Sequence, residues 1–223
     1  KQNNYTEKIR DSEFIEGNIQ TEVISHETFS SIVEIFIKLN EIEYSVLQKN
    51  QRQQFIKDTL LNIASNIQME DINTKILSEK ILQANISQEN IHFSTILYLN
   101  NYYKVNCIIF NKQTNKYYKT GLRDYSSFLC VYDNGLWYLE DREIPEDIIY
   151  SPLIDLHPLL TMDLSTNQIY KIPLKGIQNY KLAELEEMAL QNNIELKDKD
   201  NKKKRKKDLY DEINLKKIKQ QPI

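Results

Sequence analysis

The most concentrated chemical signal in the sequence is a run of six consecutive cations: Lys202, Lys203, Lys204, Arg205, Lys206 and Lys207. Lysine and arginine side chains bind phosphates, release counterions and confer affinity without reading bases. A helix is predicted to start at this run, and helix N-termini also favour phosphate. The six residues are therefore candidate DNA contacts, with weak, salt-sensitive and sequence-tolerant binding as the expected chemistry. A solvated linker and a nuclear-import signal are the alternatives for the same run.

The sequence has two cysteines, Cys107 and Cys130, and both lie in apolar runs. Thiols in strand-like apolar runs pack in a core and stay protonated, so neither is expected to act as a nucleophile. Two such cysteines do not make a disulfide scaffold, which predicts an intracellular, reducing compartment.

The three histidines, His26, His92 and His157, lie far apart and share no metal-ligand spacing. Neither cysteine belongs to a Cys-x-x-Cys pair, so no zinc site is predicted. With only 4 glycines, the chain has no Walker loop, dinucleotide fingerprint or nucleophile elbow. We therefore expect no cofactor, no metal and no catalytic residue, and a protein that is not an enzyme.

Composition indicates a folded chain with an uneven charge. The 223 residues are 40% hydrophobic and 10% aromatic, which allows a sizeable core. The net charge is −3, yet residues 181–223 hold 12 Lys and Arg against 9 Asp and Glu. An acidic body with a basic end directs that end toward an acidic surface or a nucleic acid. No run of about eighteen apolar residues exists, so no membrane span is predicted.

Helices are predicted to come first. Apolar residues at three- and four-residue steps indicate helices over 25–40, 51–67, 73–87 and 87–103. Ser25 is expected to cap the first of these, with Glu27 and Thr28 in its first turn, and Asn73 is expected to cap the third. Ser87 and Asn90 form a weakened capping box for the fourth.

The period then changes to that of strands. Residues 105–111, 115–121 and 126–140 are rich in β-branched and aromatic residues. Asn134-Gly135 predicts a hairpin within the third run. Helices followed by a small antiparallel sheet, without alternation, predict an α+β fold.

Three regions follow from these patterns. Residues 1–21 are expected to form an extended arm, 22–174 the α+β body, and 175–223 a basic helical module. Prolines mark an irregular connector over 144–173 that we expect to wrap against the body, and 167–176 is a candidate last strand.

The C-terminal region contains two short amphipathic segments. The first presents an apolar face made of Leu182, Leu185, Met188 and Ala189, and the second presents Leu209, Ile213 and Ile218. Ile194 follows an Asn-Asn pair that suits the left-handed turn ending a helix. Neither segment buries much alone, so the two are expected to pack against each other.

This stretch resembles the SAP-type helix–extended–helix module, a DNA-binding motif. The matching residues are Leu182, Leu185, Ala189, Ile194, Leu209 and Ile213, together with the Lys-rich approach to the second helix. Two features depart from the family pattern: Asn193 stands where the turn glycine is typical, and the connector KDKDNKKK is longer and more acidic. The resemblance covers 180–218 and implies DNA binding by the helical pair.

The basic module joined to an Asn-, Ile-, Lys- and Tyr-rich body is similar in style to proteins of large nucleocytoplasmic DNA viruses. That resemblance implies a virion-type structural protein, in the virion or in the host cytoplasm or nucleus. The order of elements in the body also resembles papain-like and ovarian-tumour-type cysteine hydrolases. Trp137 stands where their histidine is expected, which favours an inactive relative as the alternative.

Tyrosines are abundant, at 14, and they cluster in the predicted strands. Tyr and Trp suit protein contact surfaces, and the acidic body opposes stacking of nucleic acid on them. We expect the aromatic sheet to make protein contacts. An adaptor that docks proteins without binding nucleic acid is the second alternative.

Overall fold

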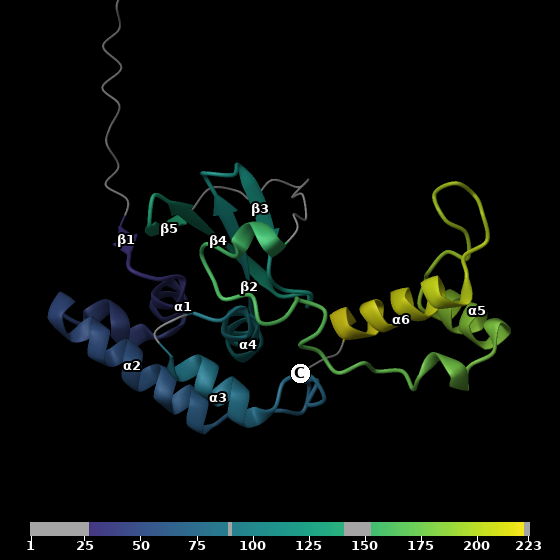
Figure 1. Ribbon diagram of the computed structural model, residues 1–223, viewed down its shortest axis with the longest axis horizontal. Coiled ribbons are helices and arrows are strands. Elements are labelled where there is room, and N and C mark those ends of the chain that lie inside the picture. The colour runs from purple at the N-terminus through teal and green to yellow at the C-terminus, as the bar shows by residue number, and fades with distance from the viewer. Residues whose placement is uncertain (1–26, 89–90, 141–152, 221–223) are drawn as a thin grey trace, which may run out of the picture.

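A two-residue strand at Thr28–Phe29 comes first, helices follow it, and the other four strands of a five-stranded sheet come next. A helical pair follows the sheet, so the predicted α+β class is confirmed (Figure 1). The computed structural model describes residues 27–88, 91–140 and 153–220. The expected arm over 1–21 and the expected cap at Ser25 lie outside these residues.

The helices of the body agree with the predicted positions to within a turn or two. They are α1 (Ile32–Asn40), a 3₁₀ helix (Ile42–Val46), α2 (Lys49–Ser65), α3 (Glu79–Ser87) and α4 (Phe93–Tyr103). Most apolar residues of the predicted stripes face the interior, because the three- and four-residue spacing places them on one side of a helix. Ile76 and Ile81 of the third predicted helix are exceptions, at 49% and 51% exposure.

The helix starts were predicted less well than the helices themselves. The Ser31 hydroxyl caps α1 by accepting the Glu34 N–H at 3.3 Å, and Ser78 caps α3 in the same way. Thr28, expected inside the first helix, belongs instead to strand β1 (Thr28–Phe29). The expected cap at Asn73 is also wrong, because Ser78 lies nearer the helix and its oxygen satisfies the first-turn amide.

The capping box expected for the fourth helix is wrong as well. Ser87 is the last residue of α3, and His92 is the N-cap of α4. The break between the two helices at Ser87 was predicted, but the start of α4 lies six residues later than expected.

The sheet consists of β1, β2 (Val105–Asn111), β3 (Lys116–Lys119), β4 (Ser126–Asp133) and β5 (Leu136–Glu140), in the order β1-β5-β4-β2-β3. The hairpin at Asn134-Gly135 is confirmed: φ is 49° and 88° at the two residues, and Asp133 pairs with Leu136.

The expected antiparallel sheet is mixed. β4 runs parallel to β2, with Cys107 opposite Phe128 and Ile109 opposite Cys130. The chain turns back from β3 on one side of β2 and places β4 on the other side, which makes β2 and β4 parallel. Turn residues indicate local hairpins, but they do not indicate which strand a later one will join.

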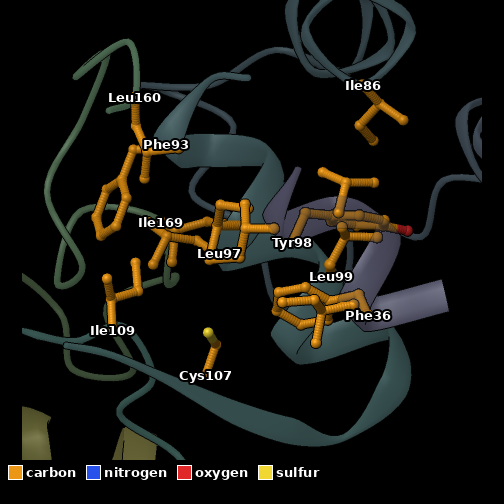
Figure 2. Close-up of a cluster of buried hydrophobic side chains, with 14 of the residues drawn as sticks. Phe36, Ile86, Phe93, Leu97, Tyr98, Leu99, Cys107, Ile109, Leu160 and Ile169 are labelled. Carbon is orange, nitrogen blue, oxygen red and sulfur yellow. The ribbon is translucent and has the colours of Figure 1, made fainter. Parts of the chain in front are cut away.

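One main core lies between the sheet and the helices. α1 and α4 cover one face of the sheet, and α2 and α3 pack outside them (Figure 1). Figure 2 shows how this core is filled, with Phe36 of α1, Leu97 and Leu99 of α4, and Cys107 and Ile109 of β2 converging on one space. None of the described helices has the length and apolar character needed to cross a bilayer.

The described part of the connector wraps against the body, as expected. Leu156, Leu160, Ile169 and Tyr170 are buried in the main core. The candidate strand over 167–176 is wrong, because this segment forms a single bridge, Tyr170 with Ile72, and the sheet does not extend to it.

Candidate nucleic-acid interface

The C-terminal helices pack against each other as a pair. α5 (Leu182–Gln191) and α6 (Lys206–Gln220) enclose a small core, separate from that of the body. Its buried members are Leu185, Ala189, Ile194, Leu209 and Ile213. The apolar stripes in the sequence predicted this pairing, since neither helix could bury its stripe alone.

The turn after α5 depends on an asparagine in the left-handed region. Asn193 has φ 53°, and the Ile194 N–H then donates to the Ala189 carbonyl at 2.8 Å. Asparagine tolerates this conformation better than other non-glycine residues. The predicted helix end at the Asn-Asn pair is therefore confirmed, and Asn193 adopts the left-handed conformation that glycine most often occupies after a helix.

The connector between the helices is a short hairpin of residues 196–204, which we call the basic hairpin. Lys197 and Lys203 form a single antiparallel β-bridge, and the Lys204 N–H donates to the Leu196 carbonyl at 2.8 Å. The Asp198 carboxylate accepts the N–H groups of Asp200 and Lys202 at 3.0 and 2.9 Å. The acidic residue that weakened the resemblance therefore organises the turn.

Three of the six predicted contact residues form ion pairs within the helical pair. Lys203 contacts Glu186 of α5 at 2.8 Å, and Lys204 contacts Glu212 of α6 at 2.7 Å. The Arg205 guanidinium donates two hydrogen bonds to the Asp208 carboxylate, each of 3.0 Å. These pairs hold the cationic segment against both helices rather than leaving it as a free tail.

The other three residues are Lys202, Lys206 and Lys207. Lys202 and Lys207 are exposed and Lys206 is half-buried. None of the ion pairs between described residues involves these three ammonium groups. They are the cations of the run that are available to an external anion.

The N-terminus of α6 is already occupied in part. Asp208 lies in its first turn and accepts the Arg205 N–H at 3.0 Å, so one amide there is satisfied by the chain itself. The Arg205 guanidinium lowers the pKa of the Asp208 carboxyl below its usual range. The expected phosphate contact to the helix N-terminus must therefore come chiefly from the lysines beside it.

α6 also connects the pair to the body. Its Ile218 is buried in the main core, whereas Leu209 and Ile213 are buried in the small one. The Leu174 N–H donates to the Asn214 amide oxygen at 3.0 Å, and the Tyr210 hydroxyl donates to the Lys175 carbonyl at 2.9 Å. The basic hairpin lies at the end of α6 away from the body (Figure 1).

An active cysteine hydrolase would need one of the two cysteines as its nucleophile, and both lie in the body, away from the helical pair. Cys107 is in β2 and Cys130 in β4, and both are completely buried, as predicted. Burial, together with the neighbouring Cys130 thiol, raises the pKa of Cys107. A nucleophile activated at a helix N-terminus is a different arrangement, so these cysteines give the hydrolase alternative no support.

The described histidines have structural neighbours. His92 lies at the start of α4, with Nδ1 3.7 Å from the Asp163 carboxylate and Nε2 2.8 Å from the Gln88 side-chain oxygen. His157 lies in the connector, and His26 is outside the described residues. Among the described residues, no group of three or more His, Cys, Asp or Glu side chains could hold a metal ion.

The aromatic side chains are divided between the two faces of the sheet. Trp137 and Tyr118 are buried in the main core, so they serve stability rather than the expected contact surface. On the opposite face Phe110 stacks on Tyr117 with ring centroids 4.5 Å apart, and Tyr138 packs beside them, each of the three half-buried.

Sequence reasoning missed a second group of cations at the inner end of α6. Lys216 and Lys219 line a cleft between α6 and the segment after β3, and Lys119 lies across from them. Their three-residue spacing on one predicted helix was a visible signal, but only the tertiary fold brings Lys119 to the same place.

Comparison with models of protein families, with curated proteins and with solved structures yields no match in any of the three.

Proposed function

We propose that this chain is a nucleic-acid-associated structural protein whose C-terminal helical pair binds duplex DNA without base specificity. The observation that carries the proposal is the basic hairpin, a cationic segment held by ion pairs to both helices at the outer end of the molecule. A fixed cationic surface meets phosphates with less loss of conformational entropy than a free tail does.

The ion pairs of the hairpin do not oppose this role. Exposed pairs of this kind contribute about 0–1 kcal/mol, so Lys203, at 65% exposure, can exchange its carboxylate for a phosphate at little cost. Lys202, Lys206 and Lys207 add charge that no described carboxylate neutralises. The resulting affinity is electrostatic and falls as salt is added.

The test is a salt titration of the full chain with a fluorescent blunt duplex, followed by anisotropy. The logarithm of the binding constant should fall linearly with the logarithm of salt concentration. A triple variant, Lys202→Gln, Lys206→Gln and Lys207→Gln, should reduce the slope by about 3, roughly one for each lost phosphate contact.

A matched control removes three exposed lysines from α2 and α3 of the body: Lys49→Gln, Lys57→Gln and Lys80→Gln. It changes the net charge by the same amount, and its salt slope should equal that of the unmodified chain. Equal slopes for the two triple variants, or no binding at low salt, would remove the proposal.

A second proposal concerns protein contacts by the body, in the setting of a virion-type structural protein. Ile42 and Val46 of the 3₁₀ helix are 89% and 81% exposed, and Leu39 near the end of α1 is 43% exposed. Exposed apolar patches favour protein contact. The test is a pull-down of partner proteins by the full chain after nuclease treatment. The double variant Ile42→Glu and Val46→Glu should lose the captured proteins and keep its affinity for DNA. Proteins that the variant still captures would exclude these residues as the contact site.

A further inference from the structure

The inner end of α6 forms one wall of a cleft of about 850 Å³. The opposite wall is the end of β3 and the segment that follows it. The side chains that matter here are Lys119 at the end of β3, Arg123 and Tyr125 from the segment after it, and Glu212, Lys216 and Lys219 from α6. Burial of Ile218 in the main core holds this end of α6 next to the body.

The cleft is positively charged on balance. Lys119, Lys216 and Lys219 line it, and no ion pair between described residues involves them. Arg123 is fixed in the wall, with its side chain 1% exposed and paired to Asp71 at 3.0 Å. Two carboxylates oppose these cations, Asp124 and Glu212, and Glu212 is already paired with Lys204 of the basic hairpin.

The cleft also offers surfaces for a flat apolar group. Tyr125 is half-buried in the wall beside the lysines, and Leu122 and Leu215 add apolar area. Aromatic rings next to cations are the combination that binds single-stranded nucleic acid, because each base can stack while the backbone meets the charges. The basic hairpin, which is exposed and lacks an aromatic side chain, instead suits the phosphates of a duplex.

We infer that the cleft takes an unpaired DNA strand, so that the protein binds a junction between duplex and single strand. The inference rests on the proposed function for the duplex part. α6 connects the two sites: Lys206 and Lys219 are separated by about 20 Å along the helix, at 1.5 Å per residue. An overhang that continues the stacking of the duplex, at about 3.4 Å per nucleotide, spans that distance with roughly six nucleotides.

The experiment measures the affinity of the full chain for a labelled duplex with overhangs of zero, three, six and nine nucleotides. Affinity should rise at least fivefold by six nucleotides and then change little. A triple variant, Lys119→Gln, Lys216→Gln and Lys219→Gln, should lose this gain while its blunt-duplex affinity stays within twofold. Tyr125→Leu should also lose the gain, and Tyr125→Phe, which keeps the ring, should retain it.

A second readout is independent of affinity. An overhang carrying 5-bromodeoxyuridine should crosslink under ultraviolet light to the peptide that contains Tyr125. An overhang that gives no gain, a gain that survives in the Lys119, Lys216 and Lys219 triple variant, or crosslinks only to residues 196–207 would each overturn the inference. If the chain binds overhangs but not blunt duplex, the proposed duplex binding is wrong and the assignment of the cleft to an unpaired strand stands.

Discussion

The two hydrophobic cores of this chain differ in what they leave at the surface. The core of the body encloses both thiols and the single tryptophan. The core of the helical pair is small, its five buried members are all aliphatic, and all six cations of the run lie outside it. In the large core of the body, the thiol and indole side chains are used for packing. Beside the small core of the helical pair, the cationic side chains remain at the surface, where a partner can bind them.

The comparison predicts that the pair can be disrupted while the body stays folded. Leu209→Ala removes a completely buried side chain from a core of five residues and should cost about 2–5 kcal/mol. Hydrogen exchange should become fast in α5 and in α6 up to Ile213, while α4 and β2 stay protected. DNA binding should be lost with it.

Leu190→Ala is the control for this change, because Leu190 lies on α5 and is 60% exposed. It should alter stability by less than about 0.5 kcal/mol. If hydrogen exchange in Leu209→Ala became faster throughout the body as well, the two cores would unfold together. They would then differ in their residue composition but not in their stability.

Gly121→Ala tests how far the body shapes the cleft beside α6. A Cβ at residue 121 would lie 1.7 Å from the Asn106 amide oxygen. Asn106 is buried and donates to the carbonyls of Arg123 and Tyr125 at 2.9 and 3.0 Å, which holds that segment in place. Loss of these bonds should cost about 1–3 kcal/mol and weaken overhang binding more than blunt-duplex binding.

Gly135→Ala provides the comparison for that variant. Gly135 has φ 88° and open space around it, so the substitution strains the hairpin turn without touching Asn106. It should cost about 1–2 kcal/mol and leave the affinity for an overhang unchanged. Equal losses of overhang binding in both variants would mean that general destabilisation, rather than the Asn106 bonds, governs the cleft.

Alkaline pH should act on the body through Tyr170. Burial raises the pKa of Tyr170 to about 12, from an ordinary value of 10.0. The folded state therefore favours the neutral phenol, and the stability that this provides is complete below pH 10.0 and is lost as pH rises toward 12. Urea unfolding between pH 8 and 12 should show this decline, and Tyr170→Phe should reduce it. If stability declined with pH to the same extent in Tyr170→Phe, the decline would come from other tyrosines. Tyr44 and Tyr103 are such residues, because burial raises their pKa as well.

The smallest expected effect is confined to the helical pair. Asn193→Gly replaces a residue at φ 53° by one that adopts this conformation freely, and it should change stability by less than about 1 kcal/mol. Asn193→Val should destabilise the pair by about 1–2 kcal/mol, because a β-branched residue is disfavoured there. Hydrogen exchange at Ile194 and Leu209 measures both, and a tolerated valine would show that the turn is not strained.

How far the sequence predicted the fold depended on the range of the interactions. Helices α2 and α4 and the hairpin at Asn134-Gly135 follow from local periods and turn residues, and all three were predicted. The parallel pairing of β2 with β4 and the pairing of Thr28 with Tyr138 join residues distant in the chain. Nothing in the local pattern specifies such partners, and both were missed.

The candidate site divides in the same way. Charge composition and apolar spacing determined that a basic segment, Lys202 to Lys207, would lie beside two helices that must share a core. Tertiary structure decided which of those cations are paired, that the connector is a hairpin, and that α6 reaches the body through Ile218. It also brought Lys119 to face Lys216, 97 positions further along the chain. Local periodicity records which side of a helix is apolar, whereas the partner of a charge depends on how distant segments pack, and only the folded chain specifies that.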